Sequence, residues 1–162
     1  MLIGILSDTH DHVEITTAAI ALLKARGAEF FIHCGDVGSE KVVDQLAGLQ
    51  AAFVFGNCDW DRDQLERYAR NIGVACHGVF ADLELAGKRI AVLHGDDPHL
   101  RERLLIAQSH DYLLQGHTHV QLDHRVGRTR IINPGALFRA RRKTVALLDT
   151  GTDQLTFLEV AQ

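Results

Sequence analysis

Short apolar runs alternate with amphipathic stretches over the first two-thirds of the chain, and this alternation constrains the fold most strongly. The apolar runs predict buried strands over residues 2–7, 29–33, 51–55, 89–94 and 111–115. Between most of them, apolar residues recur at the spacing of one helix face, which predicts helices over 12–26, 39–49, 62–71 and 98–109. Alternating strands and helices predict parallel βαβ units.

The last third of the chain has a different pattern, with short strands separated by turn signals. These strands are predicted over residues 120–126, 129–133, 144–149 and 154–160. A further hairpin is predicted around Ala86-Gly87, joining residues 79–85 to 88–93. We therefore expect an α/β fold with mixed sheets and outer helices. Because domains mostly run about 100–200 residues, we expect a single domain over residues 1–162.

Five of the predicted strands end in Asp, Asn or His beside or close to a glycine. The ends read Ser-Asp-Thr-His at 7–10, His-Cys-Gly-Asp at 33–36, Gly-Asn-Cys-Asp at 56–59, His-Gly-Asp at 94–96 and Gly-His-Thr-His at 116–119. In open α/β sheets, ligands bind outside the carboxyl ends of the strands. Glycine allows tight turns and lets the backbone approach a ligand. These ends therefore predict one shared site.

The polar residues at these ends form a set of oxygen and nitrogen ligands. Asp8 and His10 are two residues apart, as are His117 and His119, so each pair points to one side of an extended chain. Such a set suits Mn²⁺, Fe or Zn²⁺ better than Cu(I). Seven ligands exceed the needs of one zinc ion but fit two metals about 3.5–4 Å apart that share a carboxylate. The predicted metal ligands are Asp8, His10, Asp36, Asn57, His94, His117 and His119.

Each of these residues also has an ordinary structural interpretation. Asp36 and Asn57 could be turn residues, since Asn tolerates left-handed backbone angles. His94 could be a buried, hydrogen-bonded histidine, and an isolated Asp-x-His pair occurs often by chance. The metal interpretation is favoured because all five groups fall at the ends of apolar runs in one small chain.

The ordered series of motifs resembles the calcineurin-like metallophosphoesterases. The series runs Asp-x-His, Gly-Asp, Gly-Asn, His and Gly-His-x-His over residues 8–119. Asn133-Pro134-Gly135 then resembles the NPG turn of the family's small prokaryotic phosphodiesterase branch. The resemblance implies a four-layer α-β-β-α sandwich, in which two mixed sheets are flanked by helices.

The resemblance also implies a role for each ligand and a preferred metal. Asp8, His10 and His119 would bind the first metal, Asp36 would bridge, and Asn57, His94 and His117 would bind the second. We expect Mn²⁺, with Zn²⁺, Fe, Ni²⁺ and Mg²⁺ as alternatives.

One position departs from the family pattern. Many members have His after the Asn, and that His protonates the leaving group or stabilises the transition state. Here the position is Cys58, followed by Asp59, a form common in the small prokaryotic branch. We expect Asn57, Cys58 and Asp59 to be the catalytic residues, and the general acid stays open between Asp59, His12 and a metal-bound water.

The reaction expected from this site is hydrolysis of a phosphoester, with a phosphodiester preferred. A hydroxide bridging two metals would attack phosphorus in line with the leaving oxygen. The sequence contains no G-x-S-x-G serine elbow, P-loop or HExxH helix that would indicate other chemistry. Two other functions stay open: a nuclease or nucleotide-specific hydrolase, and a scaffold or binding protein that keeps the fold without turnover. The complete ligand set argues against the scaffold.

Composition limits the partners and the compartment. The net charge of −4 argues against long nucleic acid as a substrate. The basic cluster at 139–143 could still contact phosphate, or could be a solvated patch.

There is no apolar run near the ~18 residues of a membrane span, no signal-peptide start and no CxxC pair, so we expect a cytoplasmic protein without a membrane partner. We expect a small phosphoester as substrate and leave a homo-oligomer open. Trp60 could wall the pocket or pack in the core.

Overall fold

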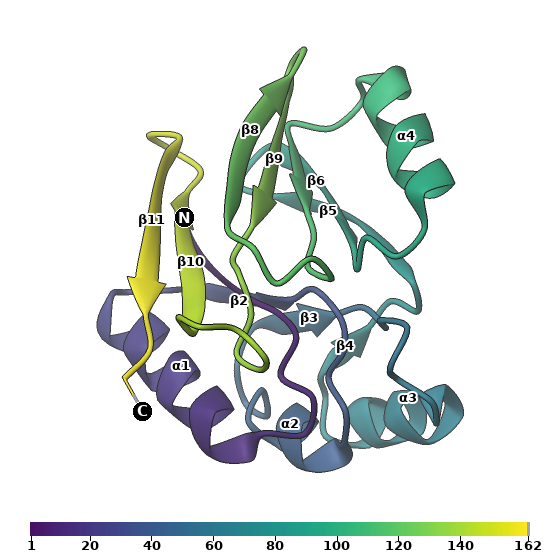
Figure 1. The fold of residues 1–162 in the computed structure, drawn as a ribbon, viewed down its shortest axis with the longest axis vertical. Coiled ribbons are helices and arrows are strands. Elements are labelled where there is room, and N and C mark those ends of the chain that lie inside the picture. Colours follow the sequence, from purple (N-terminus) through teal and green to yellow (C-terminus); the bar gives the residue numbers. More distant parts are fainter. Residues whose placement is uncertain (162) are drawn as a thin grey trace.

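Two mixed β-sheets pack face to face between helices in the computed structural model, which describes residues 1–161 (Figure 1). The first sheet has the strand order β11-β10-β1-β2-β3-β4. Its strands are β1 (Leu2–Leu6), β2 (Phe30–His33), β3 (Ala51–Phe53), β4 (Ala75–Cys76), β10 (Thr144–Asp149) and β11 (Gln154–Glu159). β1 to β4 run parallel, because each is joined to the next by a crossover that includes a helix, whereas β10 and β11 join as an antiparallel hairpin.

The second sheet has the strand order β5-β6-β7-β9-β8. Its strands are β5 (Phe80–Leu85), β6 (Lys88–Leu93), β7 (Tyr112–Leu114), β8 (Leu122–Val126) and β9 (Thr129–Asn133). The three central strands run parallel, and the two edge strands pair antiparallel to their neighbours. The β5–β6 hairpin turns at Ala86-Gly87, where both residues have positive φ angles of 51° and 71°. Such angles match the right-handed twist of a tight hairpin.

The helices cover the outer faces of both sheets. α1 (Val13–Ala25), α2 (Glu40–Asp44) and α3 (Arg62–Asn71) pack on the first sheet, where Leu23 and Val43 are fully buried in one apolar cluster. α4 (Pro98–Ala107) packs Leu100 and Leu104 on the second sheet. Ile5 and Ile90 belong to a third cluster between the sheets. The predicted four-layer α-β-β-α arrangement is confirmed.

Two local details differ from the prediction. α2 ends at Asp44, although the apolar spacing predicted a helix to residue 49, because the chain continues in turns and Gly48 has a φ of +73° that a helix does not accept. β4, which pairs with β3, was not predicted. Two residues are too short for a periodic signal.

The topology brings the carboxyl ends of five strands to one edge of the sandwich. Nδ1 of His94, after β6, lies 2.8 Å from the carbonyl oxygen of Cys34, after β2, and the backbone N–H of His117, after β7, donates to Asp8, after β1, so loops from both sheets meet there. The five strand ends singled out from the sequence are therefore neighbours. Among residues 1–161, the longest helices are too short or too polar to cross a bilayer.

Candidate metal centre

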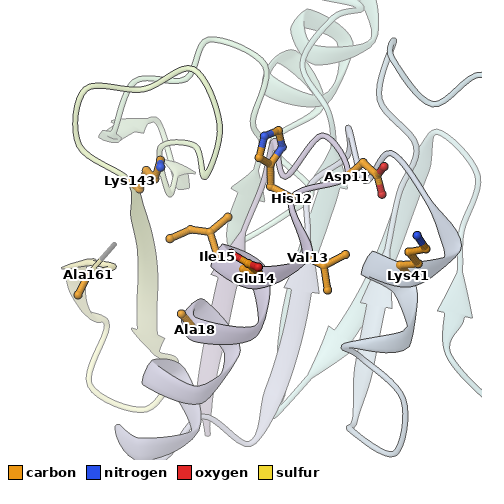
Figure 2. Close-up of a pocket in the computed structure, with 9 residues that line it drawn as sticks. All are labelled: Asp11, His12, Val13, Glu14, Ile15, Ala18, Lys41, Lys143 and Ala161. Atoms are coloured by element: carbon orange, nitrogen blue, oxygen red, sulfur yellow. The ribbon is translucent and has the colours of Figure 1, made fainter.

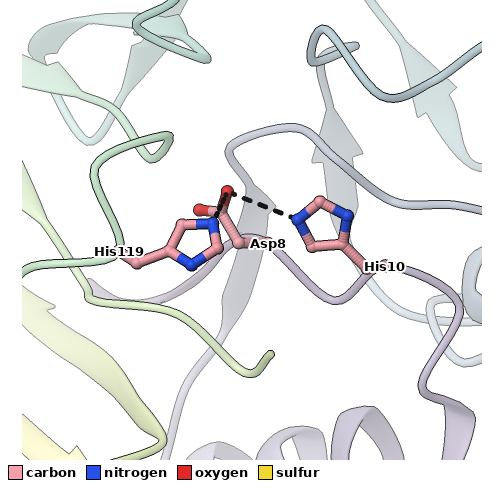
Figure 3. Close-up of side chains that lie close together, drawn as sticks. All are labelled: Asp8, His10 and His119. Carbon is pink, nitrogen blue, oxygen red and sulfur yellow. Dashed lines mark ion pairs between the residues drawn. The ribbon is translucent and has the colours of Figure 1, made fainter. Parts of the chain in front are cut away.

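The carboxylate of Asp8 is the hub of this edge. Its Oδ1 lies 3.1 Å from Nε2 of His119, 3.9 Å from Nε2 of His94 and 4.0 Å from Nε2 of His10. Figure 3 shows His10 and His119 approaching the same carboxylate from opposite sides. The other oxygen, Oδ2, accepts a hydrogen bond from the backbone N–H of His117 at 3.1 Å. The fully buried carboxylate of Asp8 thus lies within 4.0 Å of groups on four histidines.

Asp36 lies between two of the same histidines. Its Oδ2 is 3.3 Å from Nε2 of His94 and 3.4 Å from Nε2 of His10, and its Oδ1 accepts from the backbone N–H of Cys58 at 2.8 Å. The other ring nitrogen of His94, Nδ1, points away from Asp36 and lies 2.8 Å from the carbonyl oxygen of Cys34. Since a carbonyl only accepts, Nδ1 is the donor, and Nε2 faces the carboxylates. A carboxylate in this position can be shared between two cations.

Asn57 and His117 complete the group at its exposed side. Oδ1 of Asn57 lies 3.1 Å from Nδ1 of His117, and the His117 ring lies edge-on to that of His94 with centroids 5.1 Å apart. The structure therefore brings all seven predicted ligands into one connected cluster.

The donor atoms of this cluster fit divalent cations. Oδ1 of Asp8, Nε2 of His10 and Nε2 of His94 are buried and approach other ligand atoms at 3.1–3.4 Å, but none of the three forms a hydrogen bond of good geometry among the described residues. Buried polar atoms are rarely left unpaired in native proteins. Potential ligand atoms lie within 4.8 Å of one another in the groups Asp8–His10–His119 and Asp8–Asp36–His94. Oxygen and imidazole donors that surround a shared carboxylate are the set that Mn²⁺, Zn²⁺ and Fe accept.

The carboxylates and imidazoles strongly perturb each other's protonation. Burial disfavours the charged form of both Asp36 and His94, but their contact outweighs it: it lowers the pKa of Asp36 well below its usual range and, with the charge of Asp8, raises the pKa of His94 to about 9. For His10 burial prevails and lowers the pKa. A bound cation would take the place of these protons.

The ligand backbone adopts conformations that non-glycine residues seldom adopt. Left-handed φ angles occur at Asp8 (55°), His10 (44°), Asp36 (56°), His117 (69°) and His119 (58°). Such conformations cost energy and persist only where the surroundings enforce them, most often at functional sites.

Glycine is required where these loops approach one another. A Cβ at Gly116 would lie 2.6 Å from Oδ2 of Asp8, and one at Gly56 would collide with the carboxylate of Asp36. The glycines at the strand ends thus make room for the carboxylates.

Comparison with known proteins agrees with this centre. A family model described as the calcineurin-like phosphoesterase superfamily domain matches residues 1–153. The chain belongs to this superfamily. It is 30% identical over 155 residues to a phosphodiesterase of Methanocaldococcus jannaschii, with 93% of each chain covered.

Two solved structures resemble this chain along nearly its whole length. An archaeal phosphodiesterase superposes with a TM-score of 0.91 at 27% identity, covering 98% of this chain and 99% of that one. Vacuolar protein sorting 29 of Cryptosporidium parvum has a TM-score of 0.71 at 19% identity, covering 99% and 98% of the two chains, and so shares the fold.

The carboxylate of Asp59 is engaged by the backbone rather than directed at a substrate. It is 2% exposed, and its two oxygens accept from the backbone N–H groups of Gly38 at 2.9 Å and Gly56 at 2.8 Å. Arg62 donates to the carbonyls of Asp59 and Gly56, which fixes the same turn. Burial raises the pKa of Asp59 in spite of these bonds. The geometry favours a role in joining two ligand loops over that of general acid, which the sequence left open between Asp59, His12 and a metal-bound water.

The thiol of Cys58 lies among the ligands. Its Sγ forms a third potential ligand group with His10 and Asp36, whose atoms lie within 4.8 Å of one another. Burial and the nearby carboxylate of Asp36 raise the pKa of the thiol, so it keeps its proton near neutral pH. The adjacent Trp60 is 87% exposed, so the core interpretation of that residue is wrong.

Sequence reasoning missed Phe138, which adjoins the centre. Its ring stacks on His12 with centroids 4.1 Å apart and lies 5.3 Å from the ring of His10. His12 also lines an open groove of about 550 Å³ at the start of α1, with Lys143 and Lys41 along its sides (Figure 2). A phenylalanine in a loop carries no pattern that distinguishes it from a core residue.

The basic cluster at 139–143 divides into different environments. Arg142 pairs with Glu159 at 2.6 Å, whereas the guanidinium of Arg139 lies 5.2 Å above the Phe138 ring.

Asn133 of the NPG turn donates to the carbonyl of Gly116 at 2.7 Å, which supports the loop that bears His117 and His119.

Proposed function

We propose that the protein is a metal-dependent phosphodiesterase that binds two divalent cations at this centre, with Mn²⁺ preferred. The observation that carries the proposal is the set of three buried ligand atoms, on Asp8, His10 and His94, that have no hydrogen-bond partner among residues 1–161. Membership of the superfamily and the similarity to archaeal phosphodiesterases support the same activity.

The contacts within the cluster support a division of the ligands between two ions. Oδ2 of Asp36 is within 3.4 Å of both His10 and His94, which suits a carboxylate bridging between a His10 side and a His94 side. Asp8, His10 and His119 would hold the first ion, and Asn57, His94 and His117 the second. When bound, the ions would activate water and neutralise charge on the phosphoryl oxygens.

The chain's own groups would orient the substrate and supply a proton. The exposed Asn57 amide and the partly exposed Cys58 thiol lie side by side, with Nδ2 of Asn57 3.4 Å from Sγ of Cys58. A thiol that keeps its proton can donate it to a leaving oxygen, but only weakly compared with an imidazolium. We therefore expect phosphodiesters with good leaving groups to react fastest.

We also propose a cytoplasmic location, which the unpaired Cys34, Cys58 and Cys76 support, since disulfides are typical of oxidising compartments.

The decisive experiment combines metal analysis with hydrolysis of bis(p-nitrophenyl) phosphate. The chain is stripped with a chelator and reloaded with Mn²⁺, Zn²⁺ or Mg²⁺. We expect about two ions per chain and turnover that depends on them, fastest with Mn²⁺. Bound metal without hydrolysis of any phosphoester in a panel of monoesters, diesters and nucleotides would instead favour a scaffold protein with this fold.

A further inference from the structure

A buried histidine lies behind the metal centre without belonging to it. His33 ends β2, is fully buried, and lies with its Nε2 2.9 Å from Oγ1 of Thr9. Thr9 stands between the ligands Asp8 and His10 and is fully buried as well. The contact therefore joins the strand behind the centre to the loop that carries two of its ligands.

The protons of this contact can be assigned from its geometry. Oγ1 of Thr9 lies 3.0 Å from the carbonyl oxygen of Val37 and 3.3 Å from that of Asp36. A carbonyl oxygen only accepts, so the single hydroxyl proton points to one of these carbonyls. The hydroxyl oxygen then accepts from His33, which places the ring proton on Nε2. One chain of hydrogen bonds thus runs from β2 through the Asp8–His10 loop to the loop that follows Asp36.

Both of these loops contain ligand residues with an unusual backbone conformation. Asp8, His10 and Asp36 all have left-handed φ angles, and the backbone N–H groups of Asp8 and His10 donate to the carbonyls of Gly35 and Asp36. Left-handed conformations persist only where neighbouring contacts enforce them. The Thr9 hydroxyl lies at the middle of this stretch, between two such residues.

Fold stability does not explain a histidine at this position. Nδ1 of His33 is buried without a hydrogen-bond partner among the described residues, which disfavours the folded state. Burial also lowers the pKa of His33 to about 3, so the ring is neutral near pH 7. An apolar ring would fill the same space without the unpaired nitrogen.

We propose that His33 and Thr9 form a positioning pair that sets the metal affinity of the centre by holding Asp8, His10 and Asp36 in reach of the ions. The inference rests on the proposed function only in that the centre binds divalent cations. Residues that orient metal ligands through a second layer of hydrogen bonds typically change metal affinity about 10–100-fold when replaced.

The test uses matched variants of the full chain. Thr9→Val removes the hydroxyl at constant shape, Thr9→Ser keeps it, and His33→Phe replaces the donor by an apolar ring. Thr17→Val is the control, because the exposed Thr17 hydroxyl bonds to Val13 of its own helix and to Gln45 at the end of α2, away from the ligands. Mn²⁺ affinity is measured by calorimetry, thermal unfolding in excess chelator, and kcat and KM at several Mn²⁺ concentrations.

We expect Thr9→Val and His33→Phe to bind Mn²⁺ about 10–100-fold more weakly, with KM for the phosphodiester unchanged. Thr9→Ser and Thr17→Val should keep wild-type affinity. In chelator, His33→Phe should unfold at the wild-type temperature or above. If His33 served only to stabilise the fold, its replacement would lower that temperature.

Wild-type Mn²⁺ affinity in both Thr9→Val and His33→Phe would overturn the proposal, as would weak binding by Thr9→Ser. If Thr9→Val does not fold, His33→Phe decides alone. Because the readout is metal affinity, a protein that binds Mn²⁺ but hydrolyses no phosphoester would overturn the proposed activity and still test the pair.

Discussion

Carboxylates gather at two opposite edges of the sandwich, in contrasting environments. Where β7 begins, each carboxylate oxygen of Asp123 and Asp153 accepts from a neighbour: Arg130 donates to both residues, Tyr112 donates to Asp153 at 2.7 Å and so does Arg125 at 2.7 Å. Beyond the end of β7, the carboxylates of Asp8 and Asp36 face imidazole nitrogens instead, and buried atoms remain unpaired.

The difference separates a structural cluster from a ligand site. Arg130 satisfies its carboxylates with charged hydrogen bonds and ties the β8–β9 hairpin to the β10–β11 turn. Among residues 1–161, the carboxylates of Asp8 and Asp36 pair with no arginine or lysine, only with histidines, and the ligand backbone is strained. Clustered acidic residues therefore do not reveal function; unpaired buried atoms among them do.

Asp36→Asn should have the largest effect, because it removes the shared negative charge of the centre. We expect phosphodiesterase kcat to fall about a thousandfold or more, which corresponds to several kcal/mol of lost transition-state stabilisation. We also expect less than full metal loading. Steady-state kinetics and elemental analysis measure both. Asp123→Asn, the matched change in the Arg130 cluster, should retain both. Full loading and full activity of Asp36→Asn would contradict the assignment.

Metal should stabilise the fold through the Asp8 cluster alone. At a free Mn²⁺ concentration 100 times its Kd, linkage predicts about 2.7 kcal/mol of added stability, and thus a rise in Tm of about 5–10 °C for a chain of this length. Differential scanning fluorimetry with chelator or Mn²⁺ measures it. The rise should disappear in Asp36→Asn and persist in Asp123→Asn. An equal rise in both variants would place the ions elsewhere.

In contrast to Asp36→Asn, Arg130→Met should lower the stability of the fold and leave catalysis unchanged. The Arg130 side chain is 13% exposed and its carboxylate partners are about half-exposed. We expect a loss of about 1–2 kcal/mol in the free energy of unfolding, as for partly screened ion pairs. Urea denaturation measures the loss, and kcat with Mn²⁺ should not change. A fall in kcat would show that the two edges are coupled.

His33 should give the signal most confined to one condition, a pH dependence of stability in the metal-free protein at acid pH. Its pKa falls from 6.5 in the unfolded chain to about 3 in the fold, so below pH 6.5 the unfolded state binds the extra proton. Its contribution is therefore present above pH 6.5 and lost as the pH falls toward 3, by up to about 1.4 kcal/mol per pH unit. Urea titrations from pH 6.5 to 4.5 should be less steep for His33→Phe than for wild type. Parallel curves would mean that His33 protonates in the folded protein.

The sequence by itself determined the architecture and the order of the ligand residues. Strand and helix periods are local, and the rule that parallel strands present their carboxyl ends at one edge turned the residues from Asp8 to His119 into one predicted site. The same reasoning failed where the signal was short, as in the two-residue β4.

Only the tertiary structure decided which polar side chains are satisfied and by what. Asp59 is bound by the backbone of Gly38, 21 residues away in the chain, and Thr9 is bound by His33, 24 residues away. Trp60 projects into solvent, while Phe138 packs against His12. These outcomes depend on contacts between residues far apart in the sequence, for which neither composition nor periodicity carries a signal. The position of a ligand is encoded locally, whereas its unpaired, buried state arises only when the loops meet.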